Sequence, residues 1–140
     1  DPRTLAKNPV MFVVAVVSVL TTVLFLKDVG IGAGDLARAL ELLNISHRYL
    51  LRLVRLVEGN TAHWPTPSKG LENDLSVGAY ERFRGCTARL DRDELWQAYD
   101  ATWRWGAELM PELAQSHELP LPEALLGQLT DFFTHHLKNN

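Results

Sequence analysis

Residues 35–59 read DLARALELLNISHRYLLRLVRLVEG, and this stretch decides the fold class. Apolar side chains and one histidine recur in it at alternating steps of four and three residues: Leu36, Leu40, Leu43, His47, Leu50, Val54 and Val57. The opposite side of a helix with about 3.6 residues per turn carries the charged residues Arg38, Glu41, Arg48, Arg52 and Arg55. The stretch therefore predicts one long amphipathic helix that begins after Asp35 and ends near Gly59.

Downstream of this helix the sequence predicts a loop and then a short helix. Residues 60–70 hold two prolines, two threonines and a serine, which is typical of a loop. Ser76 can cap a short helix that runs to about Thr87.

Two further helices complete the pattern. Asp91, followed three residues later by Glu94, resembles a capping box and opens a helix that runs to about residue 117, with a kink expected at Pro111. A last helix is predicted over residues 122–137, since a proline stands at a first-turn position. No convincing strand is present, so we expect an all-α bundle of about five helices.

The first of these five helices is strongly apolar. Residues 10–26 read VMFVVAVVSVLTTVLFL and carry no charge. As a helix of 17 residues they span about 25 Å, slightly less than a bilayer core of about 30 Å. The segment is therefore either an inner-membrane anchor or a helix buried in the bundle. Three glycines within residues 30–34 then make a flexible joint.

Composition and charge place the chain among globular proteins. Of its 140 residues, 46% are apolar and 22% are charged, and the net charge is -3. This balance gives no basic surface for nucleic acid. The single cysteine, Cys86, excludes an internal disulfide and a thiolate metal cluster, and it fits a reducing compartment such as the cytoplasm.

Several residues suggest chemistry but have a simpler structural interpretation. Asp91 and Asp93 could hold a divalent metal, yet carboxylates are also favoured at the start of a helix. His47 lies on the apolar stripe, which favours a hydrogen-bonded core histidine over a catalytic base. Trp96 and Trp103 are seven residues apart and share one helix face, which favours core packing over an aromatic ligand wall.

The end of the long helix offers the best candidate for a binding site. Glu58, Asn60, His63 and Trp64 bring a carboxylate, an amide, an imidazole and an indole within seven residues, a mixture suited to ligands with hydroxyl or amine groups. We therefore predict substrate-binding roles for Glu58, His63 and Trp64, with Glu41 and His47 behind them. The alternative is a capped helix end with Trp64 folded over the core.

The same region carries a resemblance to a known family. Residues 55–68 read RLVEGNTAHWPTPS, residues 36–43 read LARALELL and residues 103–110 read WRWGAELM. The likeness continues at Leu71, Glu72, Asp74, Tyr80, Arg82, Phe83, Cys86 and Thr87. Over about residues 35–130 the chain resembles the C-terminal helical domain of lincosamide nucleotidyltransferases, especially the integron-borne enzymes of antibiotic resistance.

The resemblance implies an activity for the complete enzyme. Such enzymes transfer an adenylyl group from ATP to a hydroxyl of lincomycin or clindamycin and use Mg²⁺. Their catalytic residues belong to an N-terminal domain in which a Gly-Ser motif precedes paired aspartates on a strand. No position of this sequence matches those aspartates, so the resemblance assigns no catalytic residue, metal ligand or cofactor to this chain. We expect a truncated chain that is inactive without that domain.

What the resemblance assigns to this chain is the helical bundle that lines the antibiotic cleft. The partners it implies are a lincosamide antibiotic and, through dimer contacts, a second copy of the chain. A non-catalytic binding or dimerisation module is the alternative that it leaves open.

The front of the chain resembles a different family. Residues 1–28 read DPRTLAKNPVMFVVAVVSVLTTVLFLKD and are similar to the first membrane helix of the B subunit of Kdp-type potassium-transporting ATPases, except that Ala15 stands where those pumps usually have an acidic residue. The sequence thus divides into a pump-like apolar helix (1–29), a glycine-rich joint (30–34) and a substrate-binding-like domain (35–140), which suggests a gene fusion. Either the apolar helix replaces a bundle helix and packs on the second and fourth helices, or the chain is a vestigial, membrane-anchored pump fragment.

Overall fold

The computed structural model describes residues 34–116 and residue 131, and in this part of the chain every regular element is a helix. The four helices are α3 (Leu36–Glu58), α4 (Leu71–Asp74), α5 (Val77–Arg84) and α6 (Arg92–Ser116). The described residues contain no strand, which confirms the all-α prediction. The expected helices over residues 10–26 and 122–137, and most of the joint at 30–34, lie outside the described residues.

Helix α3 has the bounds that its periodicity predicts. Asp35 caps its start, because the carboxylate accepts a hydrogen bond from the Arg38 backbone N–H at 3.3 Å. Gly59 ends it in the left-handed region with φ of 74°, a conformation that glycine adopts without steric cost. Leu43, Leu50 and Val54 are buried, so the predicted apolar stripe is the face that packs into the core.

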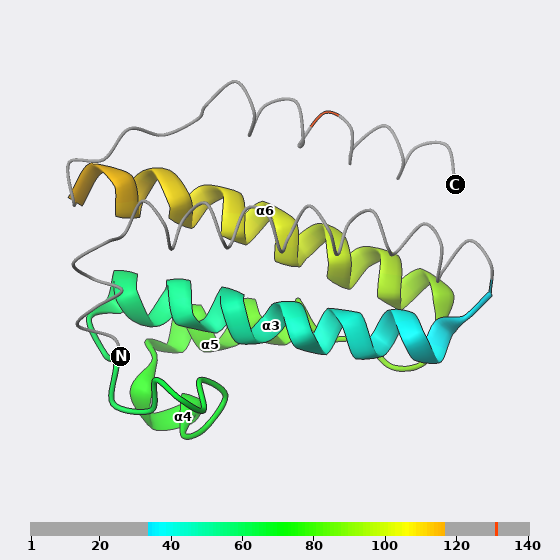
Figure 1. The fold of residues 1–140 in the computed structure, drawn as a ribbon, viewed down its shortest axis with the longest axis horizontal. Helices are drawn as coiled ribbons and strands as arrows, with labels where there is room; N and C mark the ends of the chain where they lie inside the picture. The colour runs from blue at the N-terminus through cyan, green and yellow to red at the C-terminus, as the bar shows by residue number, and fades with distance from the viewer. Residues whose placement is uncertain (1–33, 117–130, 132–140) are drawn as a thin grey trace.

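Helices α3 and α6 pack side by side and run in the same direction, and α5, which lies behind α3 in this view, carries the chain back (Figure 1). Trp96, Trp103 and Met110 of α6 are all buried, which confirms that their shared face is part of the core. Helix α6 continues through Pro111 to Ser116. No described helix has the length and apolar character needed to cross a bilayer.

The caps of the shorter elements agree in part with the sequence. Ser76 caps α5 as predicted, accepting a hydrogen bond from the Ala79 backbone N–H at 3.2 Å, although the helix ends three residues earlier than expected. Asp91 accepts from the Glu94 N–H at 2.9 Å, which is the first half of a capping box. The Glu94 carboxylate instead accepts from the Arg89 N–H at 2.8 Å, so the second half is missing. The single turn of α4 was not predicted.

One charged residue of α3 contradicts the predicted pattern. The sequence placed Arg55 on the solvent side of the helix, but its relative exposure is 0%. The reason is that residues 60–70 fold back over this part of α3. The guanidinium donates to Pro67 O at 3.0 Å and to Lys69 O at 2.7 Å, and it pairs with Asp74 Oδ2 at 2.8 Å.

The substitution Arg55→Lys tests how much the fold depends on this group. The ammonium group of lysine cannot reproduce the several N–H donors of the planar guanidinium, so some of the buried acceptors around residue 55 lose their hydrogen bonds. We expect a loss of about 3 kcal/mol in the free energy of unfolding, measured by urea denaturation and circular dichroism. Arg48→Lys, at an exposed position of the same helix, should cost less than about 0.5 kcal/mol. Equal effects of the two substitutions would contradict the organising role of Arg55.

Candidate functional site

The five residues predicted from the sequence do not converge on one place. Glu58 ends α3, and His63 and Trp64 follow in the loop. Glu41 lies 17 residues before Glu58 on the same helix, which is about 25 Å at the usual rise per residue. Its exposed carboxylate pairs with Arg38 at 2.8 Å.

His47 is part of the core. Its relative exposure is 6%, its Nε2 donates to the Cys86 carbonyl at 2.8 Å, and its ring meets the Phe83 ring edge-to-face at a centroid distance of 5.1 Å. Burial lowers the pKa of His47 to about 4, because the charged form is costly away from water, although the bond to the Cys86 carbonyl opposes this shift. The imidazole is therefore neutral at pH 7. Cys86 is also buried, as expected of a small core residue.

The loop residues His63 and Trp64 have structural contacts of their own. The Nδ1 of His63 lies 2.6 Å from Asp74 Oδ2, the same oxygen that Arg55 contacts. The hydrogen bond from His63, and then that from Arg55, hold the pKa of the Asp74 carboxyl below its usual value. Trp64 is 5% exposed and belongs to the core, with the Arg52 guanidinium 5.8 Å from its ring centroid. This arrangement matches the capped helix end considered above.

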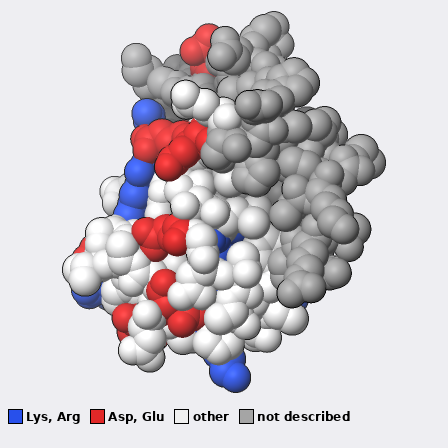
Figure 2. All heavy atoms as spheres, turned by 90° about the vertical axis from the view of Figure 1, so that its left-hand side faces the viewer, with Lys and Arg blue, Asp and Glu red and all other residues white. Residues whose placement is uncertain are grey.

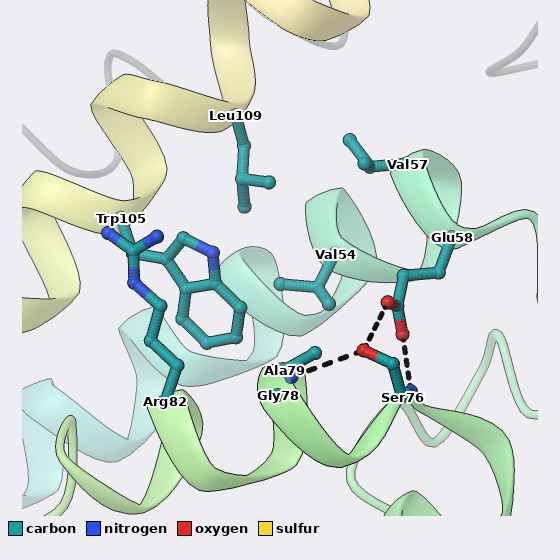
Figure 3. Close-up of a pocket in the computed structure, with 9 residues that line it drawn as sticks. All are labelled: Val54, Val57, Glu58, Ser76, Gly78, Ala79, Arg82, Trp105 and Leu109. Atoms are coloured by element: carbon teal, nitrogen blue, oxygen red, sulfur yellow. Dashed lines mark hydrogen bonds between the residues drawn. The ribbon is translucent and has the colours of Figure 1, made fainter.

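A groove with a volume of about 330 Å³ lies where the end of α3 meets α5 and α6 (Figure 3). Its lining combines residues from all three helices: Val54, Val57, Glu58, Ser76, Gly78, Ala79, Arg82, Trp105 and Leu109. The apolar side chains of Val54, Val57 and Leu109 point into the space between the helices (Figure 3). The exposed lining is almost equally polar and apolar, and the volume lies at the lower end of the range for small-molecule sites.

The polar groups of the groove lie at two edges. At one edge the Glu58 carboxylate accepts from the Ser76 backbone N–H at 2.7 Å and from its hydroxyl at 2.6 Å, so it joins the end of α3 to the start of α5. At the other edge the Arg82 guanidinium lies over the Trp105 ring, 5.2 Å from its centroid. Arg82 also pairs with Glu108 at 2.7 Å, which lowers the pKa of that carboxyl.

Of the residues that line the groove, only Glu58 was predicted to bind a ligand. Sequence reasoning missed Arg82, Trp105 and Leu109, which come from α5 and α6. One signal was present: Trp105 stands two residues after Trp103 and so faces a different side of its helix from the buried row of Trp96, Trp103 and Met110. The described residues contain no group of three His, Cys, Asp or Glu side chains placed to hold a metal ion.

Comparison with known proteins gives two kinds of match. Residues 13–132 match the family described as lincosamide nucleotidyltransferase-like, C-terminal domain. Two potassium-transporting ATPase ATP-binding subunits are similar over a short stretch: the one from Mesorhizobium japonicum is 65% identical over 43 residues, and the one from Agrobacterium fabrum is 70% identical over 37 residues. These stretches make up 31% and 26% of this chain, which spans only 6% and 5% of the length of the two curated relatives.

The buried state of His47 predicts how stability depends on pH. The pKa of His47 is about 4 in the folded chain and about 6.5 for an imidazole in water, so between these values the unfolded chain binds more protons. The contribution of neutral His47 to the free energy of unfolding is fully present above pH 6.5. It is lost as the pH falls toward 4. The loss reaches about 3 kcal/mol, at about 1.4 kcal/mol per pKa unit.

Urea unfolding measured at several pH values checks this expectation. The substitution His47→Gln keeps a donor for the Cys86 carbonyl but does not titrate. The variant should therefore show a shallower decline between pH 6.5 and 4 than the unchanged chain. An equally steep decline in both proteins would show that His47 is not its source.

Proposed function

The chain belongs to the lincosamide nucleotidyltransferase-like C-terminal domain family, and from this premise we propose that it binds a lincosamide antibiotic in the groove between α3, α5 and α6. The observation that carries the proposal is the groove itself. Apolar side chains from three helices converge in it, with a carboxylate at one edge and a guanidinium at the other. The loop residues His63 and Trp64 support its α3 edge rather than a ligand, since their contacts are with Asp74 and the core.

We assign to this chain the binding of substrate and not the transfer of an adenylyl group. The residues of the groove do not suit Mg²⁺, because the described part of the chain offers no cluster of metal-ligating side chains. They do not suit the phosphates of ATP either, because the Arg82 guanidinium already pairs with Glu108. The 140-residue sequence contains no Gly-Ser pair followed by paired aspartates. In the proposal ATP, Mg²⁺ and the catalytic carboxylates belong to a separate nucleotidyltransferase domain.

We propose that the apolar segment at residues 10–26 is a helix of the bundle. The family match begins at residue 13, inside the segment 1–28 that resembles a pump helix. This overlap supports the hypothesis that a segment of pump origin occupies the place of a helix of the bundle. The alternatives are a membrane-anchored pump fragment, for which the short pump similarities are the support, and a dimerisation module without a ligand.

Clindamycin binding to the purified chain tests the groove directly. Gly78 lines it, and a Cβ at this position would meet no atom within 4 Å. A leucine side chain there should fill the groove, so we expect Gly78→Leu to weaken clindamycin binding at least about tenfold in isothermal titration calorimetry. The matched control Gly78→Ala adds only a methyl group and should bind as the unchanged chain does. Binding that Gly78→Leu leaves intact would place the ligand elsewhere, and no binding to the unchanged chain would refute the proposal.

An adenylylation assay tests whether this chain lacks the transfer activity that we assign to a separate domain. The purified chain, incubated with ATP, Mg²⁺ and clindamycin, should yield no adenylylated antibiotic by mass spectrometry, because no residue of the sequence matches the catalytic motif. A complete lincosamide nucleotidyltransferase serves as the positive control. Turnover by the chain alone would contradict the assignment.

A further inference from the structure

The apolar walls of the groove are covered in this structure. Val54, Trp105 and Leu109 line the groove, yet they are only 1%, 4% and 6% exposed. Part of the cover is the side chain of Arg82 in α5, whose guanidinium lies 5.2 Å from the centroid of the Trp105 ring (Figure 3). A ligand that is to touch these apolar residues therefore needs one wall of the groove to move.

Of the three helices that form the groove, α5 is the one outside the core. Helices α3 and α6 pack on each other through buried side chains such as Leu50 and Leu95. Helix α5 has no buried residue. The chain is buried on either side of it, at Leu75 and at Cys86. Residues 76–85 thus form a surface segment between two buried anchors.

Residues 76–82 have two polar contacts with α3 and α6, and both lie at the surface. Ser76 donates to the Glu58 carboxylate from its N–H at 2.7 Å and from its hydroxyl at 2.6 Å. Arg82 pairs with Glu108 of α6 at 2.7 Å. Figure 2 faces the end at which α3 and α6 finish and shows several acidic side chains on the described surface there. Because water competes for such exposed contacts, they contribute little to stability and open readily.

The far end of the segment is attached more firmly. Cys86 is fully buried, and its carbonyl accepts a hydrogen bond from His47 Nε2 at 2.8 Å. Phe83 meets the His47 ring edge-to-face at a centroid distance of 5.1 Å. Residues 83–86 are therefore held to the core, whereas residues 76–82 are held by surface contacts. A helix of eight residues is also too short to be stable away from the bundle.

From these observations we infer that residues 76–82 form a lid over the groove, which opens while Cys86 stays in place and uncovers Val54, Trp105 and Leu109. Opening breaks the contacts of residues 76 and 82 with α3 and α6 and leaves the core between these two helices packed. Lids of this kind admit ligands to sites that are closed in the free protein. The inference concerns the fold around the groove and holds for any ligand that the groove takes.

Thiol labelling of the full chain, with no ligand present, tests the lid. Val54→Cys places a thiol on a covered wall of the groove, and the native Cys86 is an internal reference, because lid opening leaves it buried. Reaction with N-ethylmaleimide is followed by peptide mass spectrometry, and each rate is divided by that of the same thiol in urea. We expect the thiol at position 54 to react at least about tenfold faster than Cys86. A rate equal to or below that of Cys86 would overturn the lid.

Two matched substitutions in α6 test the contact that holds the lid. Glu108→Gln removes the charge that pairs with Arg82, so labelling at position 54 should become at least about twofold faster. Asp100→Asn breaks an ion pair with Arg104 within α6, at 2.8 Å, and should leave the rate unchanged. Circular dichroism checks that both variants are folded. The same change in both variants, or no change in either, would contradict the lid.

Hydrogen exchange of the unchanged chain tests the lid even if Val54→Cys fails to fold. The amides of residues 80–82 should exchange at least about tenfold faster than those of Leu50 and Trp103, at a rate that low urea concentrations leave unchanged, because a local opening exposes little surface. Equal protection of the two groups would overturn the lid. No ligand enters these measurements, so a failure of clindamycin to bind refutes the proposed function and leaves the lid standing.

Discussion

The buried guanidinium of Arg55 is the constraint on which the rest of the site depends. A charge with 0% exposure is stable only when its donors are satisfied, and here the backbone carbonyls of residues 67 and 69 and the Asp74 carboxylate satisfy them. These acceptors lie along the segment that leads from the end of α3 into α4. Arg55 therefore sets the path of this segment and, two residues after Asp74, the position of Ser76. The Ser76–Glu58 hydrogen bonds then close one edge of the groove.

The local pattern of the sequence was enough to predict α3, α5 and α6. Periodicity located the buried stripe of α3, and the caps at Asp35, Ser76 and Asp91 are short-range interactions that a sequence displays directly. Arg55 was placed wrongly because helical periodicity says which residues share a face and not which loop returns to cover that face. The groove escaped prediction for the same reason, since its lining comes from three helices brought together only by packing.

The polar residues at the end of α3 differ in role: some hold the loop in place, and one lines the groove. His63 contacts Asp74 and Trp64 fills the core, so both contribute to the form of the loop. Glu58 has a structural role as well, because it accepts from Ser76 at the start of α5, yet it also lines the groove. The sequence pointed to this end of α3, and there the structure gives His63 a contact with Asp74 and Trp64 a place in the core, whereas Glu58 lines the groove.

We propose that the ligand site lies between α3, α5 and α6 rather than in the loop. Isotope-filtered nuclear Overhauser measurements on the labelled chain with bound clindamycin test it most directly. If the antibiotic lies in the groove, contacts are expected from it to the methyl groups of Val54, Val57 and Leu109, which line the groove. Contacts confined to the loop around Pro65 and Thr66, with none to these methyl groups, would contradict it.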